Sequence, residues 1–151
     1  MTYYGSVLNK EVRKALMTSN IFVYPSTFEE TSCMCLIEAM SAGCICVHSS
    51  LGALPETSNN KTFMYEYTQD KMEHCTRFAN TLIKAVSKYT SISLEDQIEY
   101  AYNVFNIDTI ADKWKDVIKS IVSNDNYIVD TKVKDVVRTK VIVLPETGRL
   151  G

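Results

Sequence analysis

Short apolar runs alternate with helical spacings through the first half of the chain, an order that is typical of a parallel α/β sheet. Ile21–Tyr24 is rich in β-branched and aromatic residues and ends at Pro25, so it predicts a buried strand. A second buried strand is expected at Cys44–His48. The segment between them predicts a helix that begins near Ser32 and ends at Gly43, a residue type favoured just after helix C-termini.

The residues ahead of the first buried strand predict two smaller elements. Tyr3 and Tyr4, before Gly5, have the composition of the end of a strand whose beginning is absent. Asn9 is a residue type that caps helices, and apolar residues follow it at helical spacing. We therefore expect a helix that leads into the strand at Ile21–Tyr24.

The second half of the chain predicts three helices. Asp70 is placed to cap the first and Ser93 the second, while the third begins near Asp108. The apolar stripe of the first helix is expected to contain Met72, Cys75, Phe78, Ala79, Leu82 and Val86. The third helix has the apolar spacing of a packed helix at Ile110, Ala111, Trp114, Val117, Ile118 and Ile121.

The length of 151 residues corresponds to one domain, which we expect at residues 1–124. The pattern changes at residues 125–151, where short β-branched runs follow one another without a predictable place in the fold. The predicted fold class is α/β, with a parallel sheet, flanking helices and a helical second half.

Composition and charge exclude several function classes. The chain has 16 Lys and Arg residues against 18 Asp and Glu residues, without a long run of either sign, so nothing favours binding to nucleic acid or an anionic membrane. No apolar run approaches the roughly 18 residues that a membrane span needs. The first residues lack the pattern of a secretory signal, so we expect a cytoplasmic protein.

The cysteines favour a structural role over metal binding. Cys33 and Cys35 form one Cys-x-Cys pair in an apolar stretch, and Cys44 and Cys46 form another. Both pairs predict buried, reduced thiols. A zinc site more commonly has Cys-x-x-Cys spacing, so no metal site is expected.

Three other polar residues have simple interpretations. His48 lies at the carboxyl end of the second strand, where it is either a hydrogen-bonded structural histidine, the interpretation we favour, or a residue that approaches a ligand. His74 is expected on the surface of a helix. Glu56 follows Pro55, which is typical of a carboxylate at a helix start.

The candidate site lies between the first buried strand and the helix that follows it. In open parallel sheets, ligands bind at the carboxyl ends of the strands. A helix start offers backbone N–H groups without partners and a partial positive charge, and both suit a phosphate group. We therefore expect an anion site at Thr31 to Cys35.

Two carboxylates stand on either side of this helix start. Glu30 precedes the helix, and Glu38 follows with seven residues between the two. Glu38 lies roughly 9 Å along the helix axis from Ser32, at about 1.5 Å per residue, and helical side chains lean back toward the N-terminus. A carboxylate repels phosphate but accepts hydrogen bonds from hydroxyl groups. A ligand with hydroxyls on both sides of a phosphate is a nucleotide sugar.

The ordered series from Gly5 to Glu56 resembles the nucleotide-binding half of the retaining group 1 (family 4) glycosyltransferases, which have the GT-B architecture. The family pattern is Gly-x-Val, a helix, an apolar strand, Pro-Ser, Glu-x7-Glu-Ala-Met, Gly, a second strand, Gly and Pro-Glu. The matching residues are Gly5, Val7, the strand Ile21–Tyr24, Pro25, Ser26, Glu30, Glu38, Ala39, Met40, Gly43, Gly52, Pro55 and Glu56. The resemblance implies a partial, Rossmann-like sheet that corresponds to the C-terminal half of a GT-B enzyme.

The resemblance also implies roles for individual residues. Glu38 would hold the ribose hydroxyls of the donor, Glu30 would lie against the transferred sugar as the catalytic residue, and Val7 would lie near the nucleobase. The donor's sugar hydroxyls and diphosphate would bind the backbone amides of Thr31, Ser32, Cys33, Met34, Cys35 and Leu36. The implied reaction is retaining transfer of a hexose from a nucleotide-sugar donor to an unknown sugar, lipid or protein acceptor, without a divalent metal or other cofactor.

The chain departs from the family pattern in two respects. Thr31-Ser32-Cys33 stands where the family has Gly-Phe-Gly, so hydroxyl groups would donate hydrogen bonds in place of a close backbone approach. The family's diphosphate-binding basic pair and acceptor domain lie outside the matched series, so we expect a partner chain to supply the N-terminal GT-B domain. Two alternatives remain open, a non-catalytic or split-enzyme binding subunit of GT-B type and a nucleotide-sugar epimerase.

Overall fold

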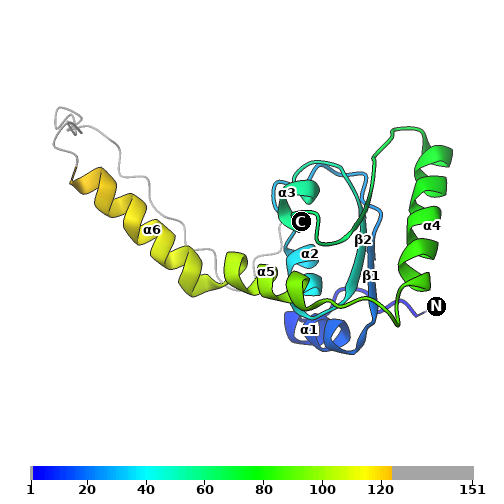
Figure 1. Ribbon diagram of the computed structural model, residues 1–151, viewed down its shortest axis with the longest axis horizontal. Coiled ribbons are helices and arrows are strands. Elements are labelled where there is room, and N and C mark those ends of the chain that lie inside the picture. Colours follow the sequence, from blue (N-terminus) through cyan, green and yellow to red (C-terminus); the bar gives the residue numbers. More distant parts are fainter. Residues whose placement is uncertain (1, 124–151) are drawn as a thin grey trace. The chain divides into compact units, whose positions relative to one another are not determined.

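The computed structural model describes residues 2–123 (Figure 1). The chain divides into two compact units, the first ending at Lys113 and the second beginning at Trp114. The predicted domain boundary at residue 124 stays a prediction. The tail at 125–151, with its short β-branched runs, lies outside the described residues.

The described elements follow the alternating order that the sequence predicts, and the α/β fold class is confirmed. The three strands form one parallel sheet in the order β1-β2-β3, as in a partial Rossmann-like fold. The elements are α1 (Asn9–Thr18), β1 (Ile21–Tyr24), α2 (Met34–Ser41), β2 (Ile45–Ser49), α3 (Leu54–Ser58), β3 (Phe63–Tyr65), α4 (Lys71–Ser87), α5 (Glu95–Phe105) and α6 (Ile107–Val122).

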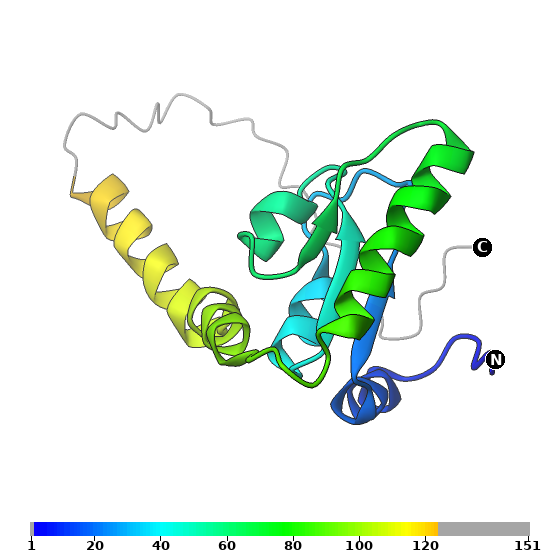
Figure 2. The same ribbon diagram turned by 45° about the vertical axis from the view of Figure 1, so that its right-hand side comes forward.

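Alternate residues of β2, together with Cys44, which directly precedes it, belong to two cores on opposite faces of the sheet. Cys44 and Cys46 belong to a buried cluster with residues of α1, α2 and α5. Ile45 and Val47 belong to a second cluster, with Ala85 of α4. Figures 1 and 2 show α2 and α4 on opposite sides of the strands. All five residues of β2 are buried, as the prediction of a buried strand requires.

The apolar face of α2 is the centre of the first core. Leu36, Ala39 and Met40 are fully buried, at the i, i+3, i+4 spacing of one helix face. The helix begins at Met34, two residues later than predicted, because Cys33 has an extended backbone and its side chain is buried in this core.

The end of α2 is fixed by a glycine and by a side chain of α5. Gly43 has a φ of +76°, the left-handed conformation expected of a residue that ends a helix. The buried Gln97 side chain donates hydrogen bonds to the carbonyl oxygens of Met40 (3.3 Å) and Cys44 (2.9 Å). These bonds attach α5 to the turn between α2 and β2.

Several predictions near the N-terminus and around the sheet are wrong. Tyr3 and Tyr4 are exposed and form no strand. Asn9 lies inside α1, because Leu8 occupies the capping position. The strand Phe63–Tyr65 was not predicted, and of the helix Leu54–Ser58 only the start was, since elements of three and five residues are too short to show a period.

The cap of α4 is confirmed, and its predicted apolar stripe is confirmed only in part. The Asp70 carboxylate accepts a hydrogen bond from the Glu73 amide at 2.8 Å. The buried residues of α4 are His74 and Ala85, whereas Met72 and Val86 are exposed. Phe78 and Leu82 of the predicted stripe are half-buried and pack against the second core, whereas Cys75 and Ala79 are exposed.

His74 and α6 also differ from their predictions. His74 is buried and not on the surface, because its Nε2 lies 3.1 Å from the Tyr65 hydroxyl and its ring packs between Tyr65 and Tyr67. The predicted helix is confirmed as α6. Its apolar residues have the spacing of a packed helix, but none of the described residues of α6 is buried. Ser93 lies one residue before the cap of α5, and its hydroxyl accepts a hydrogen bond from the Glu95 amide at 3.4 Å.

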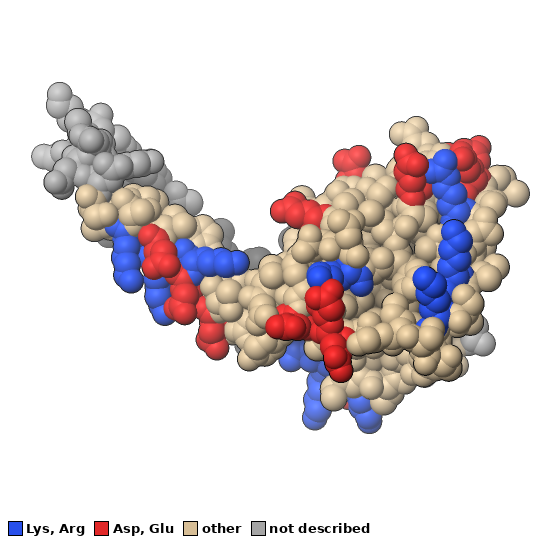
Figure 3. Space-filling model, viewed as in Figure 1, with Lys and Arg blue, Asp and Glu red and all other residues tan. Residues whose placement is uncertain are grey.

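The cysteines and charges agree with most of what composition predicts. All five cysteines are free thiols, and Cys33, Cys44 and Cys46 are buried. Cys35, in the first turn of α2, is exposed, contrary to prediction. On the face shown in Figure 3, basic and acidic side chains of the described residues are interspersed. In residues 2–123, no helix is long and apolar enough to cross a bilayer.

The position of Leu36 at the centre of the first core gives a direct test of the fold. Leu36→Ala should lower the free energy of unfolding by about 2–5 kcal/mol, because it leaves a cavity in a closely packed cluster. Met34→Ala, two residues earlier and exposed, should change it by less than about 0.5 kcal/mol. Urea denaturation of both variants measures the difference, and equal losses would contradict this description of α2.

Candidate functional site

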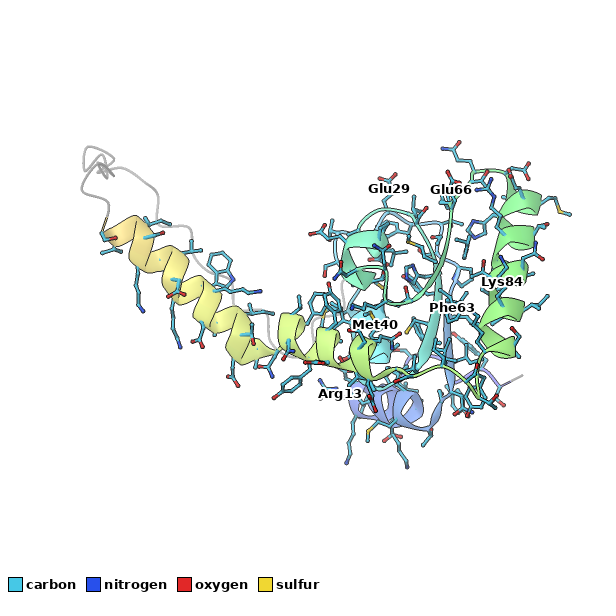
Figure 4. The ribbon with its side chains drawn as sticks, viewed as in Figure 1. Arg13, Glu29, Met40, Phe63, Glu66 and Lys84 are labelled. Carbon is cyan, nitrogen blue, oxygen red and sulfur yellow. The ribbon has the colours of Figure 1, made fainter. Side chains whose placement is uncertain are left out.

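The parallel strands bring two loops to one end of the sheet. Residues 25–33 follow β1 and residues 50–53 follow β2. The Ser49 hydroxyl donates a hydrogen bond to the Ser26 carbonyl at 3.3 Å, which joins the two loops. Figure 4 shows Glu29, after β1, and Glu66, after β3, at this end of the sheet, with Arg13 of α1 toward the opposite end. This is the end where open parallel sheets bind ligands.

Glu30 is held at this end by two contacts from different elements. The Tyr24 hydroxyl, at the end of β1, donates a hydrogen bond of 2.5 Å to Oε1 of Glu30. The Glu30 carbonyl accepts a hydrogen bond of 2.8 Å from the Ala53 amide, which follows β2. Both the carboxylate and the backbone of Glu30 are therefore fixed, although the residue lies in a loop.

Gly52 allows the second loop to approach Glu30 this closely. Its φ is +57°, and a Cβ atom on Gly52 would lie 2.8 Å from both the amide nitrogen and the carbonyl oxygen of Glu30. Only glycine combines this conformation with this contact without strain. The sequence gives Gly52 a place in the family pattern, but its contact with Glu30 is visible only in the structure.

The start of α2 has N–H groups that can bind an anion. The first backbone hydrogen bond of the helix runs from the Ile37 amide to the Cys33 carbonyl at 3.1 Å, so the amides before Ile37 have no partner within the helix. The helix has no side-chain cap and no acidic residue in its first turn. The side chains of Thr31, Ser32, Met34 and Cys35 are exposed.

Cys33 occupies the position of the missing cap. Burial raises the pKa of its thiol, and the amides of Leu36 and Cys35, which face the sulfur, partly offset this rise. The thiol is thus neutral at physiological pH and does not repel an anion. Sulfur is a weak acceptor, so these amides retain most of their capacity to bind a stronger one. Leu36 is fully buried, so only its backbone can serve this site.

Glu38 faces α1. Its carboxylate oxygen Oε1 lies 3.8 Å from Nε of Arg13, and 23% of the Glu38 side chain is exposed against 68% for Arg13. Both residues line a hollow of about 470 Å³ between α1 and α2, together with Leu16, Met17, Ile37, Ser41 and Ala42. Glu30 does not line this hollow. Glu30 and Glu38 are therefore close in the chain but do not line the same hollow.

Val7 lies in a third place. It precedes α1 and lines a hollow along that helix with Tyr4, Glu11, Val12, Lys14, Ala15, Thr18 and Ser19. Neither Glu30 nor Glu38 lines this hollow. The role of Val7 at a nucleobase stays a prediction.

His48 is a structural histidine, as favoured from the sequence. It is fully buried, and its Nδ1 donates a hydrogen bond to the Ser49 carbonyl at 2.8 Å. Its Nε2 lies 2.7 Å from the Thr62 hydroxyl, which leaves neither ring nitrogen for a ligand. Burial lowers the pKa of His48 and keeps the ring neutral.

Glu56 has the helix-start position that the sequence predicts, in the first turn of α3. Within residues 2–123, no group of three or more His, Cys, Asp or Glu side chains is placed to hold a metal ion. The residues that sequence reasoning missed at this end of the sheet are Tyr24 and Ala53, and Arg13 beside Glu38. No sequence signal marks them, because their roles depend on contacts between segments far apart in the chain.

A comparison with protein-family models decides the family. The model described as "Glycosyl transferases group 1" matches residues 1–87, which is more than half of the chain. The match includes both glutamates, the start of α2 and the Gly52 turn. The chain belongs to the group 1 glycosyltransferases. No curated protein and no solved structure gives a significant match.

Membership gives the site a chemical context. A group 1 glycosyltransferase domain of GT-B type acts in sugar transfer, which involves a sugar donor and an acceptor. The match is to transferases, so it favours sugar transfer over the epimerase alternative. The three-stranded sheet places the loop 25–33 at the carboxyl end of β1, the end where open parallel sheets bind ligands.

The contact between Gly52 and Glu30 can be tested by comparing two glycines. Gly52→Ala should destabilise the protein by about 2 kcal/mol or more, because the methyl group adds a backbone clash to a left-handed conformation. Gly5→Ala has a similar φ of +64°, but its Cβ would meet only Tyr3, at 4.0 Å. It should therefore cost about 1 kcal/mol. Urea denaturation measures both losses, and losses of equal size would refute the close approach.

The buried, neutral His48 predicts a pH dependence of stability. Its pKa is lowered from 6.5, so the unfolded chain binds more protons than the folded chain below that pH. Its contribution to stability should be complete above pH 6.5 and decrease as the pH falls. Comparing urea denaturation at pH 7.5 and 5.5 should show a loss that is smaller in His48→Gln. An equal loss in the variant would show that another group causes it.

Proposed function

We propose that this domain binds a nucleoside diphosphate sugar and presents it for retaining transfer of a hexose. The observation that carries the proposal is the fixed position of Glu30 directly before a helix start whose amides face only a weak acceptor. This arrangement places a hydrogen-bond acceptor for sugar hydroxyls beside donors for a diphosphate. The family membership supports the same assignment.

The start of α2 is proposed to hold the diphosphate. Its N–H groups and partial positive charge would stabilise the negative charge that develops on the leaving diphosphate as the glycosidic bond breaks. The exposed hydroxyls of Thr31 and Ser32 would add donors where the family has glycine. With this source of positive charge, we expect transfer to need no divalent metal or other cofactor.

Glu30 is proposed to contact the transferred hexose near its anomeric carbon. Tyr24 occupies one carboxylate oxygen, Oε1, so the other oxygen would accept a hydrogen bond from a sugar hydroxyl. A carboxylate in this position also stabilises the positive charge of an oxocarbenium-like transition state. On this ground Glu30 is proposed as the catalytic residue.

Glu38 is proposed to accept hydrogen bonds from the ribose hydroxyls. Its ion pair with Arg13 is long, at 3.8 Å, and Arg13 is mostly exposed, so the pair contributes little to stability. Ribose hydroxyls can therefore replace Arg13 at modest cost. The nucleobase would extend toward α1, and contact with Val7 remains part of the proposal.

The acceptor is proposed to bind residues of a further domain, in the same protein or in a partner chain. The described residues supply donor-binding groups, and transfer requires an acceptor hydroxyl aligned with the anomeric carbon. A split enzyme in which two chains meet around the donor would meet this requirement.

Replacing Glu38 tests the donor assignment. Glu38→Ala should weaken the binding of nucleotide sugars by about 1.5–3 kcal/mol, roughly tenfold to a hundredfold, because the ribose loses hydrogen bonds to a charged group. Isothermal titration calorimetry with UDP-glucose, UDP-N-acetylglucosamine and GDP-mannose measures the change.

Arg13→Ala is the matched control, since it removes the ion pair but keeps the carboxylate. It should bind the same nucleotide sugar at least as tightly as the wild type. Equal affinities of wild type and Glu38→Ala would refute the assignment of Glu38. Absence of binding to all three nucleotide sugars by the wild type would refute the proposed function.

A further inference from the structure

We propose that Tyr24 is a positioning residue whose hydroxyl orients the Glu30 carboxylate toward the hexose of the bound donor. The inference rests on the proposed function and assigns a role to Tyr24, which the family pattern includes only as part of an apolar strand. Its basis is the 2.5 Å hydrogen bond from the Tyr24 hydroxyl to Oε1 of Glu30.

Tyr24 is suited to this role because the sheet holds it rigidly. It is the last residue of β1 and pairs with His48 of β2. Its ring stacks on Phe22, with the ring centroids 6.0 Å apart and the planes at 14°. Both rings also pack against the core cluster that contains Leu36 and Met40. The hydroxyl thus has a position set by the strand and the core.

Glu30, in contrast, has a long side chain in a loop. Its backbone is fixed by the Ala53 amide and the close approach of Gly52, but these contacts leave the side-chain torsions free. The Tyr24 hydroxyl is the contact that selects one orientation of the carboxylate. A group held in its productive orientation before binding loses less entropy when the ligand arrives.

The protonation of Tyr24 agrees with this role. The hydrogen bond to Glu30, with a smaller effect of burial, raises the pKa of Tyr24 to about 12. The phenol is therefore a hydrogen-bond donor across the physiological pH range. Phenylalanine at this position would keep the ring stacking and lose the hydroxyl, with its bond to Glu30 and its weaker interaction with Ser26.

The test compares nucleotide sugars with the matching nucleoside diphosphates, since only the sugar reaches Glu30. Tyr24→Phe should bind UDP-glucose, UDP-N-acetylglucosamine or GDP-mannose, whichever the wild type binds, about three- to tenfold more weakly. It should bind UDP or GDP within about twofold of the wild type. Tyr65→Phe is the control, because it also removes one hydroxyl with a hydrogen-bond partner but lies on the α4 side of the sheet. It should leave both affinities unchanged.

A double-mutant cycle decides whether Tyr24 acts through Glu30. Adding Tyr24→Phe to Glu30→Ala should cause no further loss of affinity for the nucleotide sugar. A further loss in that background would overturn the positioning role, as would equal losses for the nucleotide sugar and the nucleoside diphosphate. Wild-type affinity in Tyr24→Phe would also overturn it.

A measurement without ligand tests the contact itself. In the wild-type chain with ¹³C-labelled tyrosine, the Tyr24 signal should stay in the protonated form at pH 10.5 and shift to the ionised form in Glu30→Ala. Identical titration in both would overturn the contact and the role. If the contact is present but the wild type binds none of the three nucleotide sugars, the proposed function fails and the role of Tyr24 fails with it. A loss of nucleotide-sugar affinity in Tyr24→Phe alone, with binding by the wild type, is distinct from the absence of binding by the wild type.

Discussion

The parallel pairing of β1 with β2 is the constraint on which the rest of this site depends. It aligns Tyr24 with His48, so the loops that follow the two strands leave the sheet at the same end. Only in this register can the turn at Gly52 and Ala53 reach the backbone of Glu30. The buried hydrogen bonds of His48, to the Ser49 carbonyl and the Thr62 hydroxyl, hold the end of β2 that makes this contact possible.

The site combines one glutamate held in place, Glu30, with groups that can still bind a ligand, namely Glu38 and the amides at the start of α2. Glu30 is fixed from β1 and from the turn after β2, whereas Glu38 has only a long ion pair with Arg13. The amides at the start of α2 face the neutral thiol of Cys33, a weak acceptor that leaves their positive potential largely unused. The match to the group 1 glycosyltransferases includes all three features, although the two glutamates do not line one hollow.

The sequence predicted the parts of the fold that depend on residues close to one another in the chain. The strands at Ile21–Tyr24 and around Cys46, and the apolar face of α2, follow from composition and period. Only the strand around Cys46 is buried as predicted. No residue of Ile21–Tyr24 is buried and Val23 is exposed, because β1 lies at the edge of the described sheet. The strand at Phe63–Tyr65 is too short for a period. The sequence predicts His74 on the surface of a helix. Its burial depends on ring contacts with Tyr65 and Tyr67, which lie outside that helix. Glu30 and Glu38 could be selected from their spacing, but Tyr24 and Gly52 act through contacts that no spacing reveals.

Chemical shifts of the backbone amides during titration with a nucleotide sugar test the central claim most directly. The ¹⁵N-labelled chain would be titrated with UDP-glucose, UDP-N-acetylglucosamine and GDP-mannose, with an assigned spectrum of the described residues. If the start of α2 binds the donor, the largest shifts for one of these ligands should fall in residues 30–38, with smaller changes at Gly52 and Ala53. Shifts confined to the α4 side of the sheet, or no shifts with any of the three, would contradict this account of the site.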